Sequence, residues 1–182
     1  GSAMPPALQR AAKRLFNGDN ASLPVENFSA LNRLIKLAQR HQHELRFYDD
    51  AATFVRAQLD HAQRRQHLQS RYPRGARDPG LRNLLKVPLL PYQADGVWFA
   101  AQAERALIGD EMGLGKTVQA IATAELLARE NCVKRVLVIC PTSLKHQWQQ
   151  EYKRFADRDV VIVDGTPAQR RQLYSSPAFC LI

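Results

Sequence analysis

Residues 108–119 read IGDEMGLGKTVQ and contain the residue types that bind phosphate. Gly113 and Gly115 allow a tight turn in which backbone N–H groups approach an anion closely. Lys116 can reach the β- and γ-phosphates of a nucleotide, and the Thr117 hydroxyl can coordinate Mg²⁺. The segment therefore predicts a nucleotide site with Lys116 as its catalytic cation.

The loop departs from the usual pattern at one position. The pattern G-x-x-x-x-G-K-[ST] places its first glycine where this chain has Asp110. Asp110 and Glu111 also resemble an acidic pair that holds a metal ion. Because they lie inside the loop that leads into Gly113, we interpret them as residues that shape the loop.

The elements around the loop predict an α/β fold with a doubly wound parallel sheet. Short, solidly apolar runs alternate with amphipathic helices, as in a parallel sheet that is covered on both faces. Ligands of such sheets bind at the carboxyl ends of the strands. The expected strands are 106–108, 135–140, 160–163 and 179–182, and the expected helices are 92–103, 116–129, 143–155 and 167–174.

A small all-helical segment precedes this region. Leu31, Leu34, Ile35 and Ala38 form one apolar stripe, and a second stripe follows Asp49-Asp50. We place the acidic pair at a helix start, where carboxylates stabilise free N–H groups. The segment ends in a stretch of turn residues, 72–80, that indicates a linker. The predicted domains are therefore a basic helical segment with its linker, residues 1–80, and an α/β lobe that carries the predicted nucleotide site, residues 81–182.

The net charge of +9 makes an anionic partner plausible. Residues 1–85 hold fourteen Lys and Arg against seven Asp and Glu, whereas residues 86–182 hold twelve against ten. The arginines of residues 64–77 fit a solvated helix face as well as a phosphate-contacting surface.

Three segments together resemble the Swi/Snf-type ATPases of helicase superfamily two. DEMGLGKT, residues 110–117, resembles motif I, in which the first glycine is often replaced. LPYQADGV, residues 90–97, resembles the glutamine motif that reads adenine, with Gln93 as the glutamine. VICPTSLKHQWQQEYKRF, residues 138–155, resembles motif Ia, which contacts a DNA backbone. The resemblance covers roughly residues 86–182.

The resemblance implies part of a RecA-like lobe that uses ATP and Mg²⁺ and works on DNA, with duplex favoured. The residues that it implies in ATP binding are Leu90, Tyr92, Gln93, Met112, Gly113, Leu114, Gly115, Lys116, Thr117 and Val118, with Thr117 on Mg²⁺. Those that it implies in DNA binding are Pro141, Thr142, Ser143 and Lys145.

The function expected from this resemblance is the N-terminal part of an ATP-dependent DNA translocase. The family's D-E-x-H box would lie downstream of Ile182, so we expect the 182 residues alone to be inactive in ATP hydrolysis. One alternative is a superfamily-two helicase that separates strands. Another is a basic nucleic-acid or protein interaction module that an ATPase lobe regulates. A DNA-bound protein complex is a further possible partner.

Other classes of protein are disfavoured. No apolar run approaches the roughly 18 residues that span a bilayer, so no membrane partner is expected. The three cysteines lack C-x-x-C spacing, and the histidines lack the neighbours of a metal site. We expect an intracellular protein, in the cytoplasm or nucleoid if bacterial and in the nucleus if eukaryotic.

Overall fold

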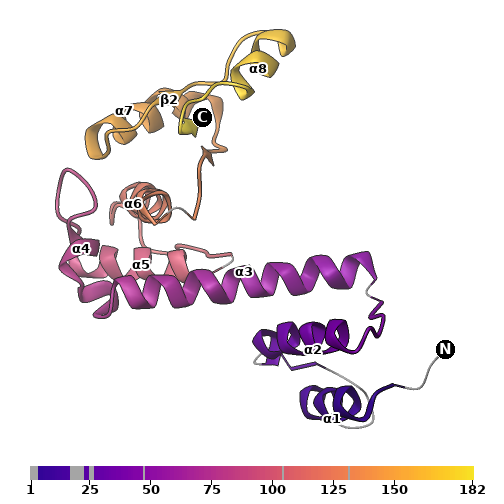
Figure 1. Cartoon of the computed structure of the whole chain (residues 1–182). Helices are drawn as coiled ribbons and strands as arrows, with labels where there is room; N and C mark the ends of the chain where they lie inside the picture. The colour runs from indigo at the N-terminus through magenta and orange to yellow at the C-terminus, as the bar shows by residue number, and fades with distance from the viewer. Residues whose placement is uncertain (1–3, 17–22, 25–26, 47, 104, 131) are drawn as a thin grey trace. The chain divides into compact units, whose positions relative to one another are not determined.

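The chain divides into two compact units, residues 1–63 and residues 64–182, and the division falls within one long helix. The computed structural model describes residues 4–16, 23–24, 27–46, 48–103, 105–130 and 132–182 (Figure 1). The sequence placed its boundary at residue 80 instead, after the stretch of turn residues.

The first unit is helical, as expected. It contains α1 (Pro6–Leu15), α2 (Phe28–Arg40) and the first part of α3 (Asp49–Arg71). Proline stands at the first position of α1, where its missing N–H leaves no bond unmade. The apolar faces of α1 and α2 pack together into a core. Its buried members are Leu8, Leu15, Leu31, Leu34 and Ala38.

The acidic pair lies in the first turn of α3, as predicted. The Asp50 carboxylate accepts a hydrogen bond from the backbone N–H of Ala51, at 2.8 Å. A carboxylate at this position stabilises the unpaired N–H groups of the helix start. The structure therefore supports a capping role for the pair.

Residues 72–82, most of which the sequence predicts to be a linker, belong to the second unit and pack within it. They form the 3₁₀ helix η2 (Gly75–Arg77) and the short helix α4 (Pro79–Arg82). Tyr72 is buried and meets Trp98 edge to face, with 6.3 Å between the ring centroids. Gly75 has φ +57 and lies against the same indole. The turn residues thus seat the chain on a neighbouring helix instead of freeing it.

The second unit is built around α6 (Lys116–Arg129). Figure 1 shows α6 between α5 (Pro91–Gln102) and α7 (Lys145–Phe155), and it packs against both. The remaining elements are the strands β1 (Val136–Leu137), β2 (Val160–Val161) and β3 (Cys180–Leu181), the 3₁₀ helix η3 (Thr142–Leu144) and the helix α8 (Pro167–Tyr174).

The three strands form a parallel sheet in the order β1-β3-β2, which confirms the predicted α/β class. Successive residues of a strand point to opposite faces. Val160 and Cys180 belong to the main core with Ile121 of α6, whereas Leu181 belongs to a second cluster with Leu173 of α8. Both faces are therefore packed, as in a doubly wound sheet.

The first predicted strand, residues 106–108, is wrong. The structure gives this segment no strand conformation, and Leu107 is 87% exposed. A strand forms only against a partner, and β1 pairs with β3 alone among the described strands. Residues 106–108 have no neighbouring strand and therefore form an exposed connection into the loop before α6.

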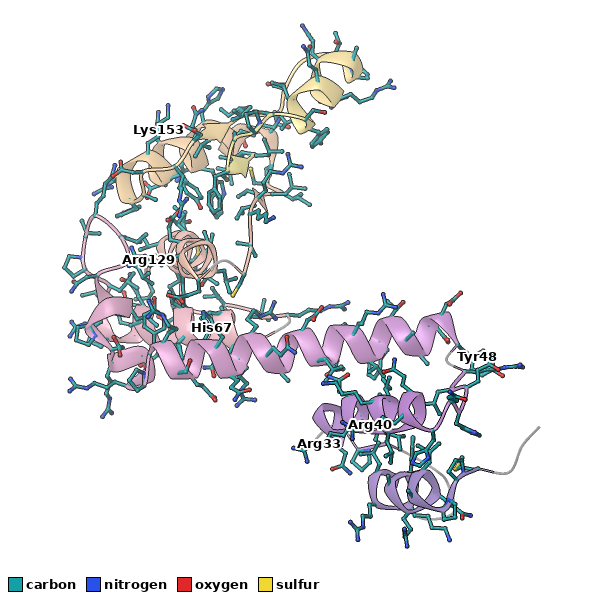
Figure 2. The ribbon with its side chains drawn as sticks, in the orientation of Figure 1. Arg33, Arg40, Tyr48, His67, Arg129 and Lys153 are labelled. Atoms are coloured by element: carbon teal, nitrogen blue, oxygen red, sulfur yellow. The ribbon has the colours of Figure 1, made fainter. Side chains whose placement is uncertain are left out.

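A buried carboxylate joins the end of α3 to the end of α6. The Glu130 side chain is only 4% exposed and accepts hydrogen bonds from Tyr72 Oη at 2.9 Å and Arg71 Nε at 3.3 Å. His67 Nε2 lies 2.9 Å from the same carboxylate, on the part of α3 labelled in Figure 2. These partners offset the cost of a negative charge at a helix C-terminus.

The same contacts shift the pKa values of Glu130 and Tyr72. Burial acts to raise the pKa of Glu130, but hydrogen bonds from Tyr72, His67 and Arg71 outweigh it and hold the pKa below the usual 4.5. Burial and the adjacent carboxylate raise the pKa of Tyr72 to about 12. At neutral pH the carboxylate is therefore charged and the phenol is a donor.

No helix among the described residues is both long and apolar enough to cross a membrane.

We expect Glu130→Gln to lower the free energy of unfolding by about 1–3 kcal/mol at neutral pH, because three donors lose a charged acceptor. A carboxylate whose pKa is lowered by folding stabilises the fold above its unfolded pKa and loses that effect as pH falls through the folded value. The gap between wild type and Glu130→Gln should therefore shrink below about pH 4.5. Urea unfolding across this pH range measures it.

The control is Asp159→Asn, at an exposed carboxylate of the same unit. It should change stability little at any pH. A gap for Glu130→Gln that stays constant as pH falls would contradict the assigned role of the charge.

Candidate nucleotide site at the start of α6

The loop before α6 has the backbone of an anion-binding turn. Gly113 has φ +86, and Gly115, the N-cap of α6, has φ +77. Both values lie in the left-handed region that L side chains rarely adopt. No side chain caps the first turn of α6, so its N–H groups are open to an external acceptor. Glycines and open N–H groups together fit a phosphate.

The structure explains why Asp110 can replace the first glycine. Among the described residues Gln42 is the one non-glycine with positive φ, so Asp110 needs no left-handed backbone. Its carboxylate accepts a hydrogen bond from Gln119 Nε2 at 2.6 Å. Gln119 is fully buried, and a Cβ at Gly96 of α5 would collide with its Oε1. Asp110 therefore fastens the loop to α6.

Sequence reasoning missed Gln119 and Gly96 as parts of this site. A glutamine in the first turn of an amphipathic helix carries no signal that separates it from a surface residue. The glycine within α5 is the one available clue, because glycine in a helix interior often marks close approach by a neighbour.

Lys116 lies over the loop. Its Nζ donates hydrogen bonds to the carbonyl oxygens of Asp110 and Glu111, each at 2.9 Å. An ammonium group has three donors, so one remains for a phosphate oxygen. The lysine thus braces the loop and presents its charge there.

Gln93 ties the start of α5 to the same loop. Its Oε1 accepts from the Leu90 N–H at 3.1 Å, and its Nε2 donates to the Leu114 carbonyl at 3.3 Å. Tyr92 Oη donates to that carbonyl as well, at 3.2 Å. The amide keeps one further donor and one further acceptor, the pair that an adenine edge needs. Gln93 is 8% exposed, so this remaining capacity lies just below the surface.

The other predicted ligand-binding residues lie at different depths around the loop. Met112 is 95% exposed and Val118 packs against the main core. Thr117 lines a small pocket between α6 and α7 with Trp148 and Glu151. No group of three His, Cys, Asp or Glu side chains is placed to hold a metal ion in the part of the chain that the structure describes.

The predicted DNA-contacting residues separate into two kinds. Pro141, Thr142 and Ser143 are exposed and stand at the start of η3. Lys145 instead has a side chain that is 17% exposed, and its Nζ donates to the Val163 carbonyl at 2.9 Å. It lies 3.9 Å from the Asp164 carboxylate. Lys145 therefore holds the segment that follows β2 against α7 and presents little of its charge to solvent.

The chain matches a known protein family. The model of the SNF2-related domain matches residues 30–179. The match begins in α2, well upstream of the resemblance over residues 86–182 that the motifs indicate.

Several curated proteins are similar over parts of the chain. Helicase SWR1 of Debaryomyces hansenii is 39% identical over 102 residues, which are 53% of this chain and 6% of that protein. The DNA annealing helicase and endonuclease ZRANB3 of Mus musculus is 42% identical over 72 residues, 39% of this chain and 6% of that protein. The chromatin-remodeling ATPase INO80 of Debaryomyces hansenii is 45% identical over 85 residues, 44% of this chain and 6% of that protein.

These relatives are far longer than the regions that match them, and the chain spans only a small fraction of each. The family model, in contrast, covers most of the chain, from α2 through the loop before α6 to Phe179, which directly precedes β3. On that coverage, this chain belongs to the SNF2-related domain family.

Proposed function

We propose that the protein is an ATP-dependent translocase that couples ATP hydrolysis to movement on duplex DNA. The observation that carries this proposal is the uncapped first turn of α6 behind a glycine loop braced by Lys116. Membership of the SNF2-related domain family and similarity to helicases and a chromatin-remodeling ATPase support DNA as the track.

In this proposal the loop binds the phosphates and the start of α5 recognises the base. The backbone of residues 112–118 provides N–H donors, and the third N–H of Lys116 meets a β- or γ-phosphate oxygen. Leu90, Tyr92 and Gln93 border the adenine. Because Gln93 also bonds the Leu114 carbonyl, base recognition and loop position share one side chain.

Mg²⁺, when bound with ATP at Thr117, would neutralise charge on the transferred phosphate. The chain's own contribution is positional. The hydrogen bond from Gln119 to Asp110 holds the loop in place. Lys116, which donates to the Asp110 carbonyl, can therefore interact with a phosphate while the loop stays where it is. Such preorganised charge is the main source of rate enhancement in phosphoryl transfer.

DNA contact is assigned to the start of η3. The Thr142 and Ser143 hydroxyls and the nearby backbone N–H groups suit phosphate oxygens. Lys145 supports this surface indirectly through Val163. We place the protein in the cellular compartment that holds DNA. Similarity to a chromatin-remodeling ATPase favours the nucleus as that compartment. The proposed partner on which translocation acts is a protein complex bound to DNA.

We expect Lys116→Ala in the full-length protein to reduce duplex-stimulated ATP hydrolysis by about 10²-fold or more, because a preorganised charge at the transferred phosphate is lost. The measurement is ATP turnover without nucleic acid, with single-stranded DNA and with duplex DNA. Lys134→Ala, at an exposed lysine away from the loop, should leave turnover unchanged.

Turnover that ignores DNA in the wild type would contradict the translocase proposal. A strand-displacement assay separates the two enzyme readings. Displacement of a triplex strand without separation of the duplex supports translocation, whereas duplex unwinding supports the helicase alternative.

We expect Gly115→Ala to destabilise the loop more than Gly113→Ala. Both changes force an L side chain to positive φ, at a cost of about 1–2 kcal/mol. A Cβ at Gly115 would also meet Gln93 Nε2 at 2.6 Å, whereas one at Gly113 would meet nothing within 4 Å. Thermal unfolding and binding of a fluorescent ATP analogue measure the difference.

The double variant Gly115→Ala with Gln93→Ala isolates the collision. Because the smaller side chain removes the clash, the second change should cost less in the Gly115→Ala background than in wild type. Equal costs in the two backgrounds would mean that Gln93 and Gly115 do not act on each other.

We expect Thr142→Ala with Ser143→Ala to weaken duplex binding and leave thermal stability nearly unchanged, since both residues are exposed. Lys145→Met should instead lower stability by about 1 kcal/mol, because the Val163 carbonyl loses a charged donor. Fluorescence anisotropy with labelled duplex and thermal melts test both. Loss of duplex binding in Lys145→Met alone, at unchanged stability, would return the DNA contact to the lysine.

A further inference from the structure

A basic groove lies between α1 and α2 in the first unit, outside the proposed nucleotide and DNA sites. It has a volume of about 530 Å³, which is in the usual range of ligand pockets. We call it the α1–α2 groove. Its lining residues are Ala11, Arg14, Leu15, Asn27, Ala30, Arg33, Leu34, Lys36, Leu37 and Arg40.

Among the residues that the structure describes, the charge on the groove has one sign. α1 has the sequence PALQRAAKRL and α2 the sequence FSALNRLIKLAQR, and neither contains an acidic residue. The four cations of the groove, one from α1 and three from α2, are exposed. None of them forms an ion pair with an acidic side chain among the residues that the structure describes.

The floor of the groove is apolar. Leu15 and Leu34 are buried members of the core of this unit, and Leu37 packs against it partly exposed. Arg33, Lys36 and Arg40 recur at helical spacing along α2 and line the groove beside this floor, and Figure 2 labels Arg33 and Arg40. From Ala30 to Arg40 the groove follows α2 for ~15 Å, about three helical turns.

An apolar floor between basic edges fits an amphipathic helix better than a nucleic acid. A DNA backbone offers charge but no aliphatic side chains for the floor. An amphipathic helix places apolar anchors at i, i+3, i+4 and i+7, and its acidic neighbours then face the edges. The groove also depends on α1, which precedes the region that the family model matches. It therefore does not follow from family membership.

We propose that the α1–α2 groove binds an acidic amphipathic helix of a partner protein. Apolar side chains of the partner occupy the floor along α2, and its carboxylates pair with Arg14, Arg33, Lys36 and Arg40. The charges steer and orient the partner, while the buried apolar area supplies most of the affinity.

The test uses the whole chain and a fluorescein-labelled peptide of Leu, Ala and Glu with leucines at i, i+3, i+4 and i+7 spacing. A second peptide has the same composition in scrambled order. Arg33→Glu with Arg40→Glu should weaken binding of the first peptide by roughly tenfold or more, because like charges then face each other. The scrambled peptide should bind weakly to every variant.

The matched control is Arg10→Glu with Lys13→Glu. It makes the same change in charge on exposed residues of α1 that do not line the groove. Peptide affinity should fall several-fold less than in the groove variant, because exposed charges that do not touch the peptide are screened by solvent and salt. Circular dichroism checks that each variant is folded. If the glutamate variant unfolds, Arg33→Gln with Arg40→Gln should still weaken binding.

Three results would overturn the proposal. Equal loss in the groove and control variants would reduce the effect to net charge. Equal binding of the two peptides would show that the apolar floor does not contribute to recognition. Loss of duplex DNA binding in the groove variant, with no peptide binding by the wild type, would make the groove a nucleic-acid surface.

Discussion

The position of α6 is the constraint on which the candidate site depends. Its first turn is the proposed phosphate-binding end, so any shift of the helix moves every N–H donor of that turn at once. Buried polar contacts fix it near both ends. At the C-terminal end Glu130 is held by the end of α3, and one turn earlier Glu125 pairs with Arg158 at 3.1 Å. At the N-terminal end Gln119 holds Asp110.

The contacts at the two ends differ in kind. Those of Glu130 are charged and desolvated, so they depend on geometry and on the ionised state of one carboxylate. Those at the loop involve amide groups and backbone carbonyls, with Gln93 reaching the Leu114 carbonyl from α5. The loop is also held through two charged groups, because the Asp110 carboxylate accepts from Gln119 and the Lys116 ammonium donates to two loop carbonyls. Each of these loop contacts has one neutral partner, whereas the Glu130 carboxylate also meets the cation Arg71.

The sequence predicted the parts of the fold that local patterns determine. Apolar runs and amphipathic helices gave the parallel sheet, and the glycines of the loop gave the turn into α6. It could not reveal Glu130 as an anchor, because that role needs residues about sixty positions away. The strand predicted at residues 106–108 failed for a related reason. An apolar run specifies a strand only where a partner strand is available, and hydrophobicity alone does not supply one.

Lys145 is a similar case within the candidate DNA site. Its type and its place in the motif indicate a phosphate contact. In the structure, however, its ammonium group donates to the Val163 carbonyl and lies near the Asp164 carboxylate. Whether a lysine is free depends on which carbonyls the fold brings within its reach, and local sequence does not contain that information. The cations of the α1–α2 groove lack such described partners and remain exposed. Charge available for binding therefore lies more in the first unit than at the start of α7, although the motif resemblance pointed to the latter.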